Sequence, residues 1–368
     1  MPDAPAALIA ATSGRALAQS ARRAGYRPLV VDRFADDDTR EVCEGACMRL
    51  VGGFRRDALL RACERLAGAG AVAGIVYGPG FEDRPQLIGA LAARWRLWGN
   101  AAGAVARLKD PEAFAALCAR GGIAHPEIAS ACPADSALWL ARQRGGSGGA
   151  HIRPASAARV AGARTYYQRR APGRPVSALV LACAGGCAIL GFSEQWAAPT
   201  RQAPFRFAGA AQPADLSGRD EKALCGAIER FCALEPLVGL NSFDFLVHGG
   251  SFCLLEVNPR PGATLDVFES GNSLFGAHVA ACEGRLRPPK RQLGATAAAT
   301  VYLDQPLERA PILDWPAWAR DRSPPGVAFK AGEPFCTVFA PGVNAFDARR
   351  RLDERAAWIR AAVQARAA

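Results

Sequence analysis

Two carboxylates and an amide lie close together in one strand-rich stretch of the sequence. Asp244 lies in the apolar run SFDFLV (242–247), and Glu256 and Asn258 belong to the run that begins SFCLLEV (251–257). The HGG between the runs predicts a hairpin turn, so antiparallel pairing would bring Asp244 beside Glu256. Side chains two residues apart on a strand share a face, so Glu256 and Asn258 project together. Oxygen ligands of this kind suit Mg²⁺. A solvent-facing sheet edge would explain Asp244 alone, but not a Glu-x-Asn-x-Arg cluster among apolar residues.

Two features upstream of this stretch are candidates for binding phosphate. Lys109 is one of only 4 Lys in a chain with 41 Arg, and it precedes Asp110-Pro111, which predicts that one helix ends and another begins there. A solvated helix end is the alternative for Lys109. The loop GGSGG (145–149) would let backbone N–H groups approach a phosphate closely, and a plain hairpin turn is the alternative.

The elements around these residues predict an α/β protein. AALIAAT, SGRALAQSARRAGY and RPLVVDRF read strand, helix and strand, with Ser13 as a candidate helix cap. Alternating elements of this kind predict an open α/β sheet over about the first 95 residues. No G-x-G-x-x-G follows the first strand, which argues against a dinucleotide site. The Pro- and Trp-rich segment 314–342 predicts short strands packed on the main body, followed by a final amphipathic helix.

Composition narrows the class of protein further. The formal charge of the 368 residues is +11, but Arg is spread singly and in pairs, which favours anionic ligands over nucleic acid. The 12 Cys include no C-x-x-C pair, so we interpret them as small buried residues in a reducing cytoplasm. No uncharged apolar run reaches about 18 residues, and the N-terminus has no basic region before its apolar run. We therefore expect a cytoplasmic protein without a membrane span or a signal peptide.

The order of these features resembles the ATP-grasp enzymes over residues 1 to about 290. The most specific part is LLEVNPRPGATLD (254–266), supported by Lys109 and the loop at 145–149. YGPGFE, EQW and PPGVAFKAGEPFCTV are similar to one branch, the predicted ATP-dependent carboligases or carboxylate-amine ligases related to biotin carboxylase. The resemblance implies a mixed α/β ATP-grasp fold in three parts. These are an open α/β preATP-grasp domain at 1–97, an ATP-grasp domain at 98–290 with a glycine-loop subdomain at about 134–180, and a strand-rich C-terminal extension at 291–368.

The resemblance also implies roles for individual residues. Asp244 and Glu256 would hold two Mg²⁺ ions, with Mn²⁺ as an alternative, and Asn258 would complete one of them. The implied catalytic residues are Arg260, facing the γ-phosphate and the acyl phosphate, together with Lys109 and Arg142. The implied nucleotide contacts, including the hinge from Gln168, are Lys109, Arg142, Gly145, Gly146, Ser147, Gly148, Gly149, Gln168, Arg169, Arg170 and Ala171. The implied substrate contacts, near GPGF (78–81), are Gln195, Gly262 and Thr264.

The chain departs from the family pattern at two of these positions. Arg142-Gln143 precedes the glycine loop where the family often has Lys, and Arg keeps the charge but not the shape of Lys. Arg169 stands where an acid usually follows the hinge Gln, so no ribose-binding acid is identified.

The activity that the resemblance implies is ATP-dependent ligation. A small-molecule carboxylate would be phosphorylated and the acyl phosphate captured by an amine, in the context of one-carbon cofactor biosynthesis with pterin or furan intermediates. Two alternatives remain open: a small-molecule kinase on the same scaffold, and a nucleotide-binding subunit with decayed catalysis, suggested by Arg142 and Arg169. We expect small-molecule partners and neither nucleic acid nor membrane, with a homodimer left open.

Overall fold

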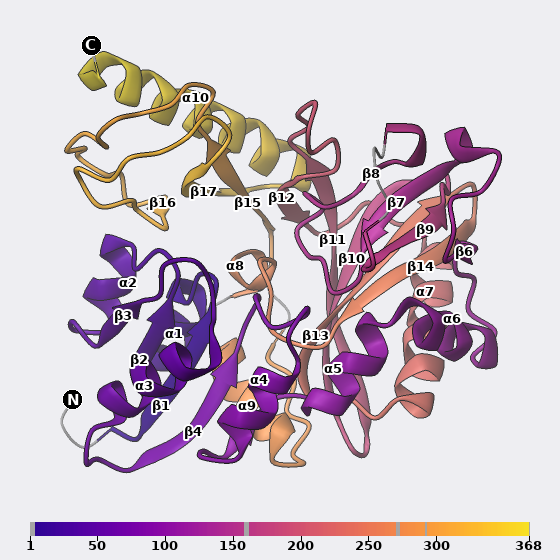
Figure 1. Ribbon diagram of the computed structural model, residues 1–368, viewed down its shortest axis with the longest axis horizontal. Coiled ribbons are helices and arrows are strands. Elements are labelled where there is room, and N and C mark those ends of the chain that lie inside the picture. The colour runs from indigo at the N-terminus through magenta and orange to yellow at the C-terminus, as the bar shows by residue number, and fades with distance from the viewer. Residues whose placement is uncertain (1–3, 158–161, 270–272, 291–292, 368) are drawn as a thin grey trace.

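The computed structural model describes residues 4–157, 162–269, 273–290 and 293–367 and contains three sheets (Figure 1). In the view of Figure 1 a five-stranded sheet lies at the lower left and a four-stranded sheet at the upper right. Long strands of an eight-stranded sheet run between them. The mixed α/β class expected from the sequence is confirmed.

The first hundred residues build the five-stranded sheet, in the order β3-β2-β1-β4-β5. All of its strand pairs are parallel, which confirms the open α/β sheet predicted for this part. Its strands are β1 (Ala6–Ala11), β2 (Arg27–Asp32), β3 (Cys47–Arg49), β4 (Val72–Tyr77) and β5 (Leu97–Trp98). The helices of this part are α1 (Arg15–Arg23), α2 (Asp37–Val42), α3 (Arg56–Ala67) and α4 (Gln86–Ala92).

The eight-stranded sheet is antiparallel, in the order β14-β13-β10-β11-β12-β15-β17-β16. Its strands are β10 (Arg174–Cys183), β11 (Gly186–Ala197), β12 (Phe207–Gln212), β13 (Gly239–His248), β14 (Ser251–Asn258), β15 (Ala295–Tyr302), β16 (Ala319–Arg320) and β17 (Pro334–Gly342). The strands expected in the C-terminal segment therefore continue this sheet by pairing β15 with β12. The boundaries predicted at 1–97, 98–290 and 291–368 stay predictions.

The four-stranded sheet is antiparallel, in the order β6-β9-β7-β8. Its strands are β6 (Ile128–Ala129), β7 (Trp139–Gln143), β8 (Arg153–Pro154) and β9 (Thr165–Arg169), with short 3₁₀ helices at Ser136–Leu138 and Ala155–Ala157. The remaining helices are α5 (Ala102–Lys109), α6 (Pro111–Arg120), α7 (Gly218–Leu234), α8 (Leu265–Phe268), α9 (Leu274–Cys282) and α10 (Ala345–Ala367). None of the described helices is long and apolar enough to cross a membrane.

Two local predictions that position the candidate site are confirmed. The HGG turn joins β13 to β14, and both of its glycines have positive φ, 54° at Gly249 and 77° at Gly250. Helix α5 ends at Lys109, and Asp110 caps α6 by accepting a hydrogen bond from Ala113 N–H at 2.9 Å. The cap at Ser13 is wrong: α1 begins after Gly14, and the Ser13 hydroxyl instead donates to Asp321 Oδ1 at 2.9 Å.

The hydrophobic core links the five-stranded sheet to the eight-stranded one. Phe275 of α9 is fully buried in a cluster that also contains Ile9 of β1 and Leu179 of β10. Its ring packs edge-on against Trp98 at the end of β5, with centroids 6.4 Å apart. Tyr77, at the carboxyl end of β4, donates to the Pro259 carbonyl at 3.1 Å, which places this end of the sheet beside the residues that follow β14.

Candidate active site

The β13–β14 hairpin brings the predicted metal-binding side chains together. Asp244 pairs directly with Glu256 in the strand register, and Ser242 pairs with Asn258. The Asn258 amide donates from Nδ2 to Asp244 Oδ2 at 3.0 Å and to Glu256 Oε1 at 3.1 Å. Ser177, on the neighbouring strand β10, donates to Asp244 Oδ1 at 2.6 Å. The expected convergence is therefore present, and its role in binding metal stays a prediction.

The two carboxylates of this group have opposite pKa shifts. Burial and the nearby Glu256 carboxylate raise the pKa of Asp244 to about 6. Burial alone would also raise the pKa of Glu256, but Lys109 and Arg142 outweigh it and hold that pKa at about 2. Two adjacent carboxylates are a donor set that a divalent cation would stabilise, and the oxygen of the Asn258 amide, which here accepts from Lys109, would join them if the amide turned over.

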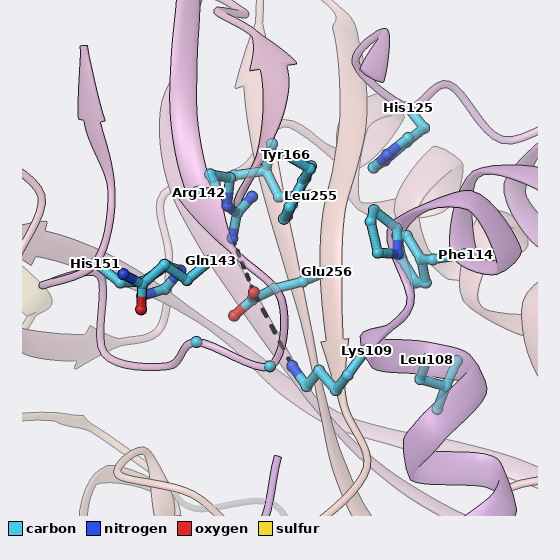
Figure 2. A pocket seen from close by; sticks show the side chains of 13 residues that line it. Leu108, Lys109, Phe114, His125, Arg142, Gln143, His151, Tyr166, Leu255 and Glu256 are labelled. Carbon is cyan, nitrogen blue, oxygen red and sulfur yellow. Dashed lines mark hydrogen bonds and ion pairs between the residues drawn. The ribbon is translucent and has the colours of Figure 1, made fainter. Parts of the chain in front are cut away.

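Two cations approach this group from different elements (Figure 2). Lys109, at the end of α5, donates from Nζ to Asn258 Oδ1 at 2.7 Å and lies 4.0 Å from Glu256 Oε2. Arg142, on β7, donates from Nη2 to Glu256 Oε2 at 3.0 Å and from Nη1 to Gln168 Oε1 at 2.6 Å. Its Nε is buried and has no hydrogen-bond partner among the described residues. Both side chains are nearly buried, with 7% and 6% exposure, so their charges act in a poorly hydrated place.

A small cavity of about 30 Å³ lies between these cations and the glycine loop. It is lined by Leu108, Lys109, Pro111, Phe114, His125, Arg142, Gln143, Gly145, Gly146, His151, Tyr166, Leu255 and Glu256. The sequence prediction did not include His151, although it follows the glycine loop directly. Burial, followed by the charge of Arg142, lowers the pKa of His151 to about 4, so its ring is neutral at ordinary pH.

The glycine loop lies in tight contact with other parts of the chain. A Cβ at Gly149, whose φ is 73°, would lie 1.9 Å from the Phe205 carbonyl oxygen. A Cβ at Gly146 would lie 2.4 Å from the His151 ring. Glycine is therefore required at these two positions, and Gly148 also has positive φ, at 69°. Whether the loop acts as a lid over phosphates stays a prediction.

Arg260 is held by an acid that the sequence prediction did not include. Its Nε and Nη2 donate to Glu82 Oε1 at 2.8 and 2.6 Å, and the two side chains are only 9% and 4% exposed. Glu82 Oε2 accepts a hydrogen bond from Gly80 N–H at 2.8 Å, so the acid is fixed at the end of β4. Gly262 leaves room for this arrangement, because a Cβ there would lie 2.6 Å from Arg260 Nη1. The predicted contact of Arg260 with phosphate stays a prediction.

Comparison with known proteins agrees with this geometry. The family model described as ATP-grasp domain matches residues 120–264, the segment that carries Arg142, the glycine loop and the β13–β14 hairpin. Residues 120–264 match the ATP-grasp domain. A search of curated proteins finds no match.

Solved structures show the same fold over nearly the whole chain. The N5-carboxyaminoimidazole ribonucleotide synthetase of Thermus thermophilus is 17% identical with a TM-score of 0.70, covering 97% of this chain and 98% of that one. The carboxyaminoimidazole ribonucleotide synthase of Aspergillus clavatus, complexed with ATP, is 14% identical with a TM-score of 0.70, covering 98% and 100%. The biotin carboxylase of Campylobacter jejuni is 14% identical with a TM-score of 0.72, covering 95% and 90%. At these identities the likeness establishes the ATP-grasp fold.

The predicted hinge of the ATP-grasp domain joins β9 to β10. Gln168 is buried and reaches the cavity through its hydrogen bond with Arg142. The backbone N–H groups of Arg169 and Arg170 already donate within the chain, to the carbonyls of Glu127 and Leu138 at 2.8 Å each. Ala171 follows them without a strand partner. Contacts of this segment with adenine stay predictions.

Of the predicted substrate residues, Gln195 lies beside the carboxylate group, and Gly262 and Thr264 follow Arg260. Gln195 Nε2 is 3.5 Å from Asp244 Oδ1. Gly262 lies beside Arg260, and Thr264 begins the turn into α8. The hydroxyls of Thr264 and Ser242 are buried without a hydrogen-bond partner among the described residues. Such hydroxyls could bind a polar ligand, and the substrate role stays a prediction.

A second cavity of about 380 Å³ lies between the glycine loop and the carboxyl ends of β1 and β4. Four arginines contribute to its lining, namely Arg33, Arg84, Arg144 and Arg164. Ser147 of the glycine loop and Glu82 line it as well. Since Glu82 binds Arg260, this cavity adjoins the predicted catalytic arginine.

Proposed function

We propose that this protein is an ATP-dependent ligase that activates a small-molecule carboxylate as an acyl phosphate and joins it to an amine. The observation that carries the proposal is the convergence of Lys109 and Arg142 on the Asp244, Glu256 and Asn258 group. This convergence lies at the wall of one cavity in an ATP-grasp domain. The Aspergillus clavatus enzyme, which has the same fold, was solved with ATP, and this supports ATP as the nucleotide.

The residues present fit magnesium as the cofactor. Asp244, Glu256 and Asn258 offer two carboxylates and an amide, and the raised pKa of Asp244 reflects burial and then repulsion from Glu256, both of which a bound cation would offset. Bound Mg²⁺ supplies positive charge to the phosphate groups during transfer, and Mn²⁺ would serve the same purpose.

The chain's own residues would neutralise and orient the transferring phosphate. A carboxylate oxygen of the substrate attacks the γ-phosphorus as the bond to ADP breaks, giving an acyl phosphate. The amine nitrogen then attacks the acyl carbon, loses its proton, and expels inorganic phosphate. Lys109, Arg142 and Arg260 are charges held in place before the reaction, which is the main form of catalysis that phosphoryl transfer requires. No nucleophilic side chain is needed.

The second cavity is the proposed site of the carboxylate and the amine. It adjoins Arg260 through Glu82, and it is open to the glycine loop on the side of the nucleotide cavity. Four arginines on its walls favour substrates that carry negative charge.

The experiment that tests this proposal follows a carboxylate oxygen of the substrate into inorganic phosphate. Purified protein is incubated with Mg²⁺, ATP and pools of metabolite carboxylates and amines, and ADP is measured. For an active pair, an ¹⁸O-labelled carboxylate should deliver one label to inorganic phosphate. A kinase would keep phosphate on its product and transfer no label, and a subunit with decayed catalysis would bind ATP without forming ADP. Either result would refute the ligase.

The proposed pathway context is one-carbon cofactor biosynthesis with pterin or furan intermediates. It rests only on the similarity of the sequence to one branch of the family. A comparison of metabolites between a deletion strain and its parent tests it, because the accumulated carboxylate or amine would identify the substrates.

A further inference from the structure

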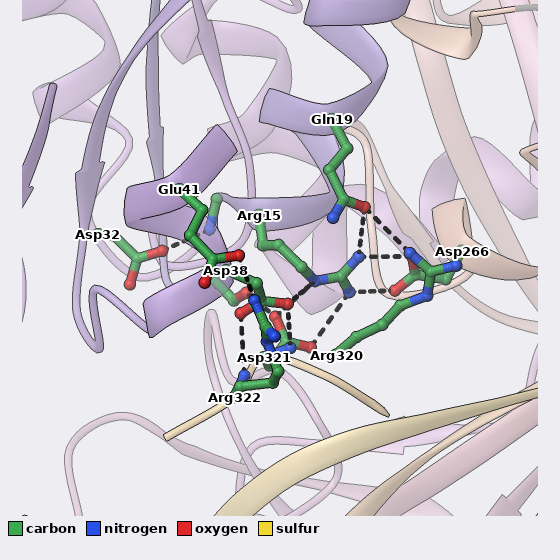
Figure 3. A network of polar contacts seen from close by, with 11 residues as sticks. Arg15, Gln19, Asp32, Asp38, Glu41, Asp266, Arg320, Asp321 and Arg322 are labelled. Atoms are coloured by element: carbon green, nitrogen blue, oxygen red, sulfur yellow. Dashed lines mark hydrogen bonds and ion pairs between the residues drawn. The ribbon is translucent and has the colours of Figure 1, made fainter. Parts of the chain in front are cut away.

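The buried guanidinium of Arg15 binds two carboxylates that lie far from it in the sequence (Figure 3). Its side chain is 2% exposed. The guanidinium donates from Nη1 to Asp266 Oδ1 at 2.8 Å and from Nη2 to Asp266 Oδ2. It also donates from Nε to Asp321 Oδ1 at 2.9 Å and from Nη2 to Asp321 Oδ2 at 3.1 Å. Paired, bidentate contacts of this kind fix both position and orientation.

The three residues come from three separate parts of the chain. Arg15 begins α1 beside the five-stranded sheet, Asp266 lies in α8 directly after the β13–β14 hairpin, and Asp321 follows β16 in the C-terminal segment. Asp321 is itself firmly placed, since its N–H donates to Asp38 Oδ2 at 2.9 Å and its φ is 49°. A non-glycine residue in that conformation persists only where its surroundings hold it.

The turn at residues 260–266 is held at each end by an ion pair. Both partners belong to the part of the chain that builds the five-stranded sheet. At one end Arg260 is bound by Glu82, and at the other Asp266 is bound by Arg15. Between them Leu265 N–H donates to the Gly262 carbonyl at 3.1 Å, so the turn is compact. The position of Arg260 therefore depends on two ion pairs, one at each end of the turn.

We propose that Asp321 is a positioning residue for the 260–266 turn. By binding the Nε–Nη2 edge of Arg15, it keeps the adjacent Nη1–Nη2 edge facing Asp266. Asp38 lies 3.9 Å from Arg15 Nε and is the acid that would compete for the guanidinium if Asp321 lost its charge. Arg15 would then rotate towards Asp38, Asp266 would lose its partner, and the turn would loosen. The C-terminal segment would in this way help to complete the site, a conclusion that rests on the proposed function where it concerns Arg260.

The test replaces Asp321 with Asn, which tolerates the left-handed backbone at φ 49° and removes the charge together with one of the two oxygens that accept from Arg15. Hydrogen exchange is measured by mass spectrometry on peptides that cover 259–268 in the full chain. The exchange of the Leu265 and Val267 amides should become about 10-fold faster, the scale of one hydrogen bond to a charged group. Asp266→Asn, which breaks the same link from the other side, should give the same pattern. Glu41→Gln is the matched control, because Glu41 pairs with Arg322 across the same contact but does not touch Arg15.

Turnover provides a second measurement. Asp321→Asn should lower kcat about 10-fold and change the KM for ATP by no more than twofold. In a protein that already carries Arg260→Lys, Asp321→Asn should not lower kcat further, because the effects of two residues that act through the same interaction are not additive. Unchanged exchange at 259–268, or faster exchange spread equally over β1 and β4, would overturn the proposal. If the wild-type protein turns over no substrate, the proposed function fails, but the exchange measurement still decides whether Asp321 holds the turn.

Discussion

Replacement of Arg142 tests the nucleotide site most directly. Arg142→Ala removes two hydrogen bonds, one of 2.6 Å to Gln168 and one of 3.0 Å to Glu256. Lys109, at 4.0 Å, is then the cation that remains beside Glu256. A hydrogen bond to a charged group is worth about 1.5–3 kcal/mol, or about 10- to 150-fold in a dissociation constant. Arg142 already pairs with Glu256 when no nucleotide is bound. Only the free-energy difference between that contact and its contact with the nucleotide therefore contributes to the affinity. We therefore expect the Kd for Mg²⁺-ATP to rise by about 10-fold.

Arg142→Lys separates charge from shape at this position. Lysine keeps the positive charge but loses the planar fork that contacts Gln168 and Glu256 together, so we expect it to retain part of the affinity. Titration calorimetry with Mg²⁺-ATP gives the Kd, and thermal unfolding shows that each variant is folded. Arg94→Ala removes the same charge from an exposed pair with Glu64 and should leave the Kd within twofold. Wild-type affinity in both Arg142 variants would mean that Arg142 only holds Glu256 and Gln168, and the reasoning would be refuted.

Three further predictions concern the metal group, the arginine of the turn and a buried acid. Glu256→Gln should abolish ADP formation and make ATP binding less dependent on Mg²⁺, while the melting curve stays cooperative; full activity would remove Glu256 from the metal site. Arg260→Ala should lower kcat by about 100-fold or more with little change in ATP affinity measured by calorimetry, and Arg260→Lys should recover little; a collapse of affinity with kcat intact would place Arg260 in ground-state nucleotide binding. Burial and three neighbouring carboxylates raise the pKa of Asp36 from its ordinary 3.8 to about 9, so the folded state keeps a proton that the unfolded chain releases between those values. The free energy of unfolding should therefore fall as pH rises through that window. Measured by urea unfolding between pH 6 and 8, the free energy of unfolding of Asp36→Asn should increase relative to that of wild type by about 1.4 kcal/mol per pH unit. If the free energies of unfolding of the two proteins changed equally with pH, Asp36 would be ionised in the folded state.

The hairpin and its carboxylates could be predicted because their determinants are local. Polar and apolar residues alternate in 242–245, and the adjacent glycines at 249 and 250 can adopt the positive φ that a two-residue turn needs. Together these fix the register that sets Asp244 opposite Glu256. The helix break after Lys109 is predictable for the same reason, since proline begins a helix but cannot continue one.

The partners of the two arginines could not be predicted, because tertiary topology chooses them. Glu82 and Arg260 are 178 residues apart, and Arg15 and Asp321 are 306 apart. Nothing in the local sequence distinguishes Arg15 from the other arginines of a chain that has 41. The C-terminal strands show the same limit: the segment 314–342 predicts short strands packed on the main body, but only the whole fold determines that β17 pairs with β15 and β15 with β12.

The pairing of β15 with β12 has a consequence for how the chain could be divided. Gly209 of β12 approaches β15 so closely that a Cβ there would lie 2.5 Å from the Ala298 carbonyl oxygen. A chain that ended at residue 290 would leave this row of backbone N–H and C=O groups as an open edge on a strand whose Ala208, Ala210 and Ala211 are buried in the full chain. Unpaired apolar edges recruit other strands, so the shortened protein should aggregate. The C-terminal segment is therefore not an independent module of this fold, and deletion mapping of activity would report solubility before it reported chemistry.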